Sequence, residues 1–188
     1  MTPFELFFGL TSVILALALT QLADSFQKLL RAGSRVRWAI EPLLQAALIV
    51  MIVVFVWVDQ WHDRNLAEVT VPQSLLQVLK LLAVYVVAAA ALPEPPESGQ
   101  VDLHDHYMTS RKVTYGALVA GLLLFTAYRY MFYAPGHEPI NNSLFLGLFL
   151  LGTYISLMFV RWRPFHIVAL MVVCLAYAVQ VAPATIGA

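Results

Sequence analysis

The chain has 188 residues, of which 61% are hydrophobic and 12% are charged, and its formal net charge is zero. Soluble domains carry about 25% charged residues, so a chain this apolar would aggregate in water. The zero net charge excludes a global electrostatic field that would attract nucleic acid or an acidic partner. Cys174 is the only cysteine, which excludes disulfides within the chain and any haem-attachment or zinc pattern built on paired cysteines.

Apolar stretches follow one another along the whole chain, and each is long enough to cross a lipid bilayer. A spanning helix needs about 20 mainly apolar residues. The predicted helices cover residues 4–27, 38–61, 73–92, 112–133, 142–160 and 164–182. We therefore predict an all-α, polytopic membrane protein: a single transmembrane domain over 1–188, built as a bundle of six helices. The lipid bilayer is its expected partner, and no cofactor is predicted.

The basic residues between the predicted helices gather on one side of the membrane. Residues on that side are Lys28, Arg31, Arg35, Arg37, Arg111, Lys112, Arg161 and Arg163, against Arg64 and Arg129 on the other. Cytoplasmic loops carry an excess of Lys and Arg. The bias therefore predicts that both termini are non-cytoplasmic.

The longest connection, residues 93–111, is predicted to be a cytoplasmic linker. It opens with prolines that cannot continue a helix. Its second half is compatible with a short helical segment that leads into the next span, with Asp102 as the N-cap.

Polar residues near the cytoplasmic side of the first two helices are candidates for an inner vestibule. Gln21, Asp24 and Lys28 share one face of the first helix, and Glu41 and Gln45 lie one turn apart on the second. The alternative is that Asp24 simply pairs with Lys28 and that Glu41 occupies a helical first turn.

The third helix carries a polar stripe toward its outer end. Gln73, Gln77 and Lys80 follow the spacing i, i+4, i+7, which places them on one face. Lys80 lies about 10 Å into this helix by the rise per residue. Its side chain either snorkels outward or faces a water-filled cavity.

Carboxylates and imidazoles on the outer side form a candidate metal site. Its residues are Asp59, His62, Asp63, His137 and Glu138. Imidazole and carboxylate ligands suit zinc and other divalent metals, but these residue types are equally ordinary at a membrane interface. The cytoplasmic Asp102, His104, Asp105 and His106 invite the same question, although His104 and His106 do not share a helix face. His62 and His166 lie near opposite surfaces, which argues against a haem held between them.

The polar residues near the middle of the predicted helices are neutral. Examples are Thr11, Tyr85, Thr153 and Tyr154. Proton-coupled transporters place an ionisable group near the middle of the bilayer, so ion-coupled transport is disfavoured. No HExxH or GxSxG pattern occurs, and no enzymatic activity is expected.

Small residues on the fourth helix, Gly116, Ala117, Ala120 and Gly121, would allow close helix packing. They serve either contacts within the chain or the interface of a homo-oligomer.

Two segments carry a resemblance to known sequences. They are FELFFGLTSVILALALTQLADSFQKLL at residues 4–30 and AAALPEPPESGQVDLHDHY at residues 89–107. With the patterns FELxFG and LP…DLxxHY, the chain resembles a group of bacterial six-helix integral membrane proteins whose activity is uncharacterised. The resemblance implies a multi-pass protein of the bacterial inner membrane. It also implies a cytoplasmic docking or ligand site at Asp102, His106 and Tyr107.

Two classes of function fit these observations. The first is passive, channel-like or facilitative permeation of an ion or small solute through vestibules lined by the polar faces. The alternative is a non-transporting membrane scaffold, sensor or accessory subunit that docks a partner through residues 93–111.

Overall fold

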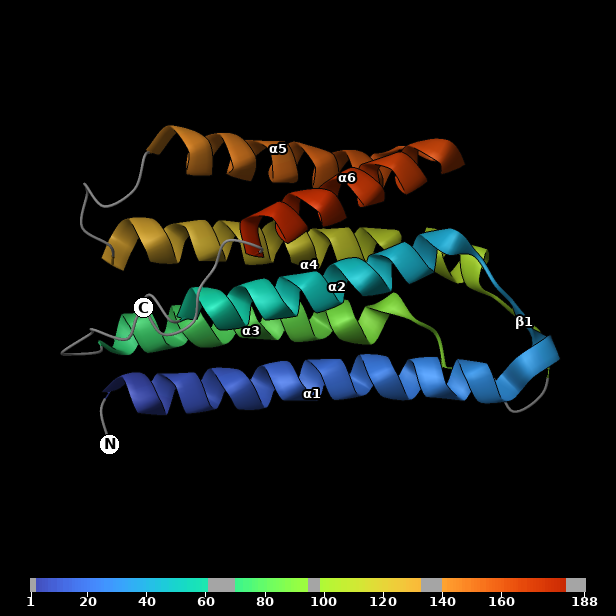
Figure 1. Ribbon diagram of the computed structural model, residues 1–188, viewed down its shortest axis with the longest axis horizontal. Helices are drawn as coiled ribbons and strands as arrows, with labels where there is room; N and C mark the ends of the chain where they lie inside the picture. Colours follow the sequence, from blue (N-terminus) through green and yellow to red (C-terminus); the bar gives the residue numbers. More distant parts are fainter. Residues whose placement is uncertain (1–2, 61–69, 95–98, 133–139, 182–188) are drawn as a thin grey trace.

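The computed structural model describes residues 3–60, 70–94, 99–132 and 140–181, and this part of the chain is all-α, as predicted (Figure 1). The helices within it are α1 (Pro3–Ala32), α2 (Ile40–Asp59), α3 (Val71–Ala91), α4 (Leu103–Phe132), α5 (Ile140–Phe159) and α6 (Arg163–Val181). Successive helices run in opposite directions, so α1 begins and α6 ends toward the same end of the bundle.

Helices of the described residues include four that are long and apolar enough to cross a membrane. These candidate spans are Phe4–Arg35, Ile40–Asp59, Val71–Ala91 and Arg163–Gln180, and Leu144–Phe159 is a shorter apolar helix. On α3, the exposed side chains of Leu75, Leu79, Leu82 and Val86 form an apolar stripe along one face. Contiguous apolar surface of this kind is tolerated in lipid and unfavourable in water.

The helices pack in two layers. In one layer α1 contacts α3, α3 contacts α4, and α4 contacts α5; in the other, α2 packs against α6. Helix α2 also touches α1, α3 and α4, which places it at the centre of the bundle. Its core-facing side chains, such as Leu48 and Ile49, are almost completely buried.

Small residues on α4 face its neighbours within the chain. A Cβ atom placed on Gly121 would lie 3.3 Å from the Cβ of Ala83 on α3, and one on Gly116 would lie 3.8 Å from Met158 Cε on α5. Both glycines therefore serve packing within the bundle, which was one of the two alternatives. Ala120 is exposed, and homo-oligomerisation stays a prediction.

We call the end of the bundle at which α1, α3 and α5 end the basic end, after the Lys and Arg residues of the connections there. Two short strands pair at this end. Strand β1 (Val36–Arg37) follows a 3-10 turn at Gly33–Arg35 and pairs in parallel with β2 (Val101–Asp102). Gly33 has φ +56°, a left-handed conformation that ends α1 at little cost because glycine has no Cβ. Register partners Arg37 and Asp102 also form an ion pair, with Arg37 Nη1 3.0 Å from Asp102 Oδ2.

Helix boundaries differ most from the prediction at α4. Residues 103–111, expected in the linker 93–111, form the first turns of α4, which begins at Leu103 rather than at 112. Asp102 is the N-cap, as predicted: its Oδ1 accepts hydrogen bonds from the backbone N–H groups of His104 at 2.9 Å and Asp105 at 3.3 Å. Helix α1 also extends to Ala32, beyond the predicted end at 27.

Candidate functional site

A buried carboxylate lies at the basic end, where α2 begins. Glu41 is in the first turn of α2, and its side chain is fully buried. The guanidinium of Arg163, at the start of α6, binds both of its oxygens; Nε donates to Oε1, and Nη2 donates to Oε2 at 3.3 Å. His104 Nδ1 lies 3.3 Å from Oε1, close enough for an ion pair but not aligned as a hydrogen bond. Glu41 therefore ties α2 to α6 and lies against α4.

A chain of hydrogen bonds runs beside this carboxylate. Tyr107 Oη lies 2.8 Å from Tyr115 Oη and 2.7 Å from His166 Nδ1, and His166 Nε2 lies 2.9 Å from the carbonyl of Val160. A carbonyl only accepts, so Nε2 carries the proton, and Nδ1 of the neutral ring is an acceptor. Tyr107 must then donate to His166, and Tyr115 must donate to Tyr107. Burial raises the pKa of Tyr107, so its hydroxyl keeps its proton.

The carbonyl of Val160 accepts a second hydrogen bond, from a residue of α4. Arg111 Nη1 donates to it at 3.0 Å and contacts Met108 Sδ at 3.5 Å. Val160 directly follows α5, so its carbonyl is one of the groups a helix leaves unsatisfied at its C-terminal end. Donors from α4 and α6 therefore cap α5 at the basic end.

Asp102, His106 and Tyr107, the proposed docking residues, each make a defined contact. His106 Nε2 lies 3.3 Å from the carbonyl of Ala90 in the last turn of α3 and caps that helix. Burial lowers the pKa of His106, although this hydrogen bond acts against the shift. Burial alone would raise the pKa of Asp102, but the N–H groups of Asp105 and His104 and the charge of Arg37 bring it below its usual value.

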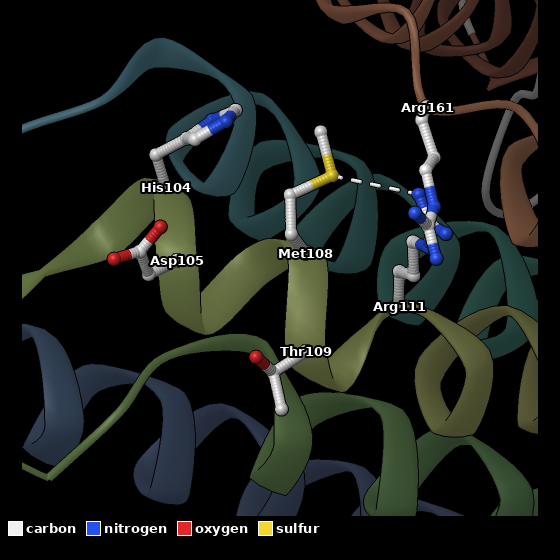
Figure 2. A pocket seen from close by; sticks show the side chains of 6 residues that line it. All are labelled: His104, Asp105, Met108, Thr109, Arg111 and Arg161. Atoms are coloured by element: carbon white, nitrogen blue, oxygen red, sulfur yellow. Dashed lines mark hydrogen bonds between the residues drawn. The ribbon is translucent and has the colours of Figure 1, made fainter.

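An open depression of about 580 Å³ lies next to these groups. Figure 2 shows the six residues that line it: His104, Asp105, Met108, Thr109, Arg111 and Arg161. All but one come from the first turns of α4, and Arg161 comes from the turn between α5 and α6.

The residues predicted to line an inner vestibule make separate contacts and do not form one group. Lys28 pairs with Asp24 at 2.9 Å and with Glu94 at 2.8 Å, near the protein surface. The pairing of Asp24 with Lys28 was the predicted alternative to a vestibule. Gln21 is half-buried on the same helix. Gln45 is fully buried one turn beyond Glu41, and neither of its amide atoms has a hydrogen-bond partner among the described residues.

The predicted stripe on α3 is buried against other helices. Gln77 Nε2 donates to Thr11 Oγ1 on α1 at 2.9 Å and also reaches Gln60 Oε1. Gln73 closes a capping box with Thr70, whose N–H donates to Gln73 Oε1 at 2.8 Å. This contact accounts for Gln73 without a vestibule.

Lys80 lies near the middle of α3, and its side chain is buried rather than extended to the surface. Its Nζ atom is 4.4 Å from the ring centroid of Tyr128 and 5.2 Å from that of Phe125, both on α4. A cation over aromatic faces is attracted by their quadrupoles. Lys80 thus lies against α4 and does not snorkel.

Of the predicted outer metal ligands, only Asp59 lies among the described residues, where it pairs with Arg129 at 3.4 Å. His62, Asp63, His137 and Glu138 fall outside them. Within residues 3–60, 70–94, 99–132 and 140–181, no group of three or more His, Cys, Asp or Glu side chains is placed to hold a metal ion. Of the second group of metal candidates, Asp102 pairs with Arg37, His104 lies against Glu41, and His106 contacts the carbonyl of Ala90.

Sequence reasoning missed Arg111, Tyr115, Arg163 and His166 as members of the site. A helical reading of residues 103–115 would have placed Tyr107, Arg111 and Tyr115 on one face at i, i+4, i+8. No signal in the sequence pairs this face with α6, because that contact is tertiary.

Comparisons of the chain with known protein families, with curated proteins and with solved structures found no match. The resemblance to bacterial six-helix membrane proteins therefore stays a prediction.

Proposed function

We propose that the chain is a multi-pass protein of the bacterial inner membrane, with six spans and both termini non-cytoplasmic. The alternating helix directions and the accumulation of Lys and Arg at the basic end support this orientation. The basic end then faces the cytoplasm.

Thiol labelling tests the orientation. In a Cys174→Ala background, a membrane-impermeant reagent should label Ser34→Cys only in inverted vesicles and Gly136→Cys only in right-side-out spheroplasts. Labelling of both variants in the same preparation would overturn the topology.

We further propose that the protein is a non-transporting accessory or scaffold protein whose basic end docks a partner. One observation carries this choice: α2, α4 and α6 are locked together there by Glu41, Arg163, Tyr107 and His166, beside an open depression. A rigid polar assembly presents its exposed neighbours in a fixed geometry, which specific docking requires. The exposed Trp162 lies at this end, and aromatic residues are common anchors at interfaces.

Purification from native membranes tests the docking role. Tagged full-length protein should retain a stoichiometric partner, and Trp162→Ala should lose it. Tyr130→Ala is the matched control, because Tyr130 is a similarly exposed aromatic residue at the opposite end of the bundle. Retention of the partner by both variants, or the absence of a stoichiometric partner, would contradict the proposal.

Gln45 supports passive permeation as a second candidate function. A fully buried amide without a partner is usually solvated by water or a ligand. A water-filled path beside Gln45 would provide that solvation. Permeation requires that liposomes containing the protein pass ions or small solutes faster than empty liposomes. Gln45→Leu should then slow this flux, and unchanged flux in the variant would remove Gln45 from the path.

A further inference from the structure

Two arginines from different parts of the chain line the depression at the basic end. Arg111 comes from α4 and Arg161 from the turn before α6, and Figure 2 shows their side chains extending toward one another. The depression, about 580 Å³, falls in the range of about 300–1,000 Å³ that is usual for small-molecule sites.

The charges of these two arginines are not neutralised within the described residues. No carboxylate there lies within ion-pair distance of Arg111 or Arg161, whereas Lys28, Arg37 and Arg163 each have a carboxylate partner. Asp105 is the single acidic residue of the lining, and it is exposed. Two like charges at one site repel each other, and an anion beside them would reduce that repulsion.

Arg111 supplies a second, independent observation. Its side chain is 6% exposed, and its Nε has no hydrogen-bond partner among the described residues, although Nη1 binds the carbonyl of Val160. A buried N–H without an acceptor is costly. The Nε atom itself is enclosed, but Arg111 lines the depression, where a ligand oxygen can form a charge-assisted hydrogen bond with the guanidinium.

We propose that the depression binds a phosphate group, held by the guanidinium groups of Arg111 and Arg161. Guanidinium forks match the geometry of phosphate oxygens, and Thr109 and His104 add polar groups to the wall. His104 also lies against Glu41, so an occupant of the depression sits next to the buried cluster that joins α2 to α6. The phosphate belongs either to a soluble compound or to the headgroup of an anionic lipid in the adjacent leaflet.

This assignment rests on the proposed role of the basic end in binding, and it is tested separately on purified protein. Full-length protein in an uncharged detergent is unfolded thermally in two series. In one, inorganic phosphate is compared with chloride at equal ionic strength. In the other, micelles contain phosphatidylglycerol or, as the control, a diacylglycerol with the same chains. A bound ligand stabilises the folded state, so the unfolding temperature should rise saturably in at least one series.

Variants assign that stabilisation to the two arginines. Arg161→Gln should raise the half-saturating concentration about tenfold, the expected loss for one charge-assisted contact. Lys112→Gln, which removes an exposed charge next to Arg111 but outside the lining, should change it less than about twofold. Asp105→Asn should strengthen binding, because it removes a negative charge from the lining. Arg111→Gln also removes the cap on Val160, so Arg161→Gln remains the decisive variant if Arg111→Gln does not fold.

The outcomes separate the two sources of phosphate. Stabilisation by inorganic phosphate but not by phosphatidylglycerol identifies a soluble ligand, and stabilisation by phosphatidylglycerol identifies a lipid headgroup. No shift in either series, or equal weakening by Arg161→Gln and Lys112→Gln, would overturn the assignment. A partner that still co-purifies in that case would leave the docking role intact.

Discussion

Tyr107 stands between two polar partners in a fully buried position. Its hydroxyl donates to His166 and accepts from Tyr115, so its removal leaves both partners without this contact. The cost of such a change comes chiefly from the desolvated groups that remain, rather than from the bond itself.

Tyr107→Phe is therefore expected to lower the free energy of unfolding by about 1–3 kcal/mol. Tyr130→Phe makes the same chemical change on the same helix at an exposed position, and it should change stability by less than about 0.5 kcal/mol. Denaturant unfolding in detergent micelles measures both. Equal effects of the two variants would mean that the chain of hydrogen bonds does not contribute to stability.

His106 gives the fold a dependence on pH. Burial places its folded-state pKa below the ordinary value of 6.5, so the unfolded chain binds a proton more readily than the folded protein. The stability that the neutral His106 side chain supports is fully present above the pKa of the unfolded state. This stability declines as the pH falls from about 6.5 toward the pKa of the folded state.

We expect the stability of the protein to fall as the pH is lowered through this window, and His106→Gln to reduce that fall. Unfolding curves of both proteins between pH 7.5 and pH 5 provide the comparison, and their difference isolates His106 from the other histidines. Parallel pH profiles would show that His106 is not protonated differently in the two states.

Contacts between near neighbours were predictable at the scale of single residues. The pair of Asp24 and Lys28 and the cap at Asp102 each follow from sequence spacing and local helix chemistry. The partners of Glu41 were not predictable, because Arg163 and His104 lie far from it in the sequence. Spacing rules describe one helix and carry no information about which other helix faces it.

Helix ends show how far the sequence specifies an element. Apolar length located the helix ends to within two residues, except for the end of α1 and the start of α4. Its first turns are too polar to be recognised from hydropathy. They are nevertheless helical because Asp102 caps them and because Leu103, Tyr107 and Arg111 turn one face into the bundle. Burial of that face, a tertiary effect, decided the boundary.

The contact of α3 with α4 depends on the absence of a side chain at Gly121. A Cβ atom there would already lie 3.3 Å from Ala83, so branched atoms beyond it would have to displace α3. Gly121→Val is expected to destabilise the protein by about 1–3 kcal/mol, the usual cost of overpacking.

Gly147→Val is the matched control on α5, since a Cβ placed there has no described atom within 4 Å apart from its chain neighbours and the backbone of its own helix. Both variants introduce the same β-branched residue into a helix, so a difference in unfolding free energy reports on packing alone. A difference below about 0.5 kcal/mol would mean that the two helices can separate freely at this point.

The arrangement of the whole bundle was beyond sequence analysis. Spans that are apolar on every side have little periodicity, so the sequence does not indicate which face packs and which meets lipid. The central place of α2 and the layer formed by α1, α3, α4 and α5 come from packing between helices. As a result, the polar residues assigned to one vestibule lie in separate contacts of different helix pairs.

The interior of the whole molecule is either dry or wet around Gln45, and one substitution distinguishes the two. If the bundle is closed there, the buried amide lacks partners and is unfavourable, and Gln45→Leu should raise the free energy of unfolding by about 1–2 kcal/mol. If a water-filled path reaches the amide, leucine would displace that water and lower stability instead.

Gln77→Leu is the control, because Gln77 is equally buried but hydrogen-bonded to Thr11, so its loss should be destabilising in either case. We expect Gln45→Leu to be stabilising, since the proposed docking role needs no open path through the core. Destabilisation by Gln45→Leu, together with reduced solute flux, would favour permeation.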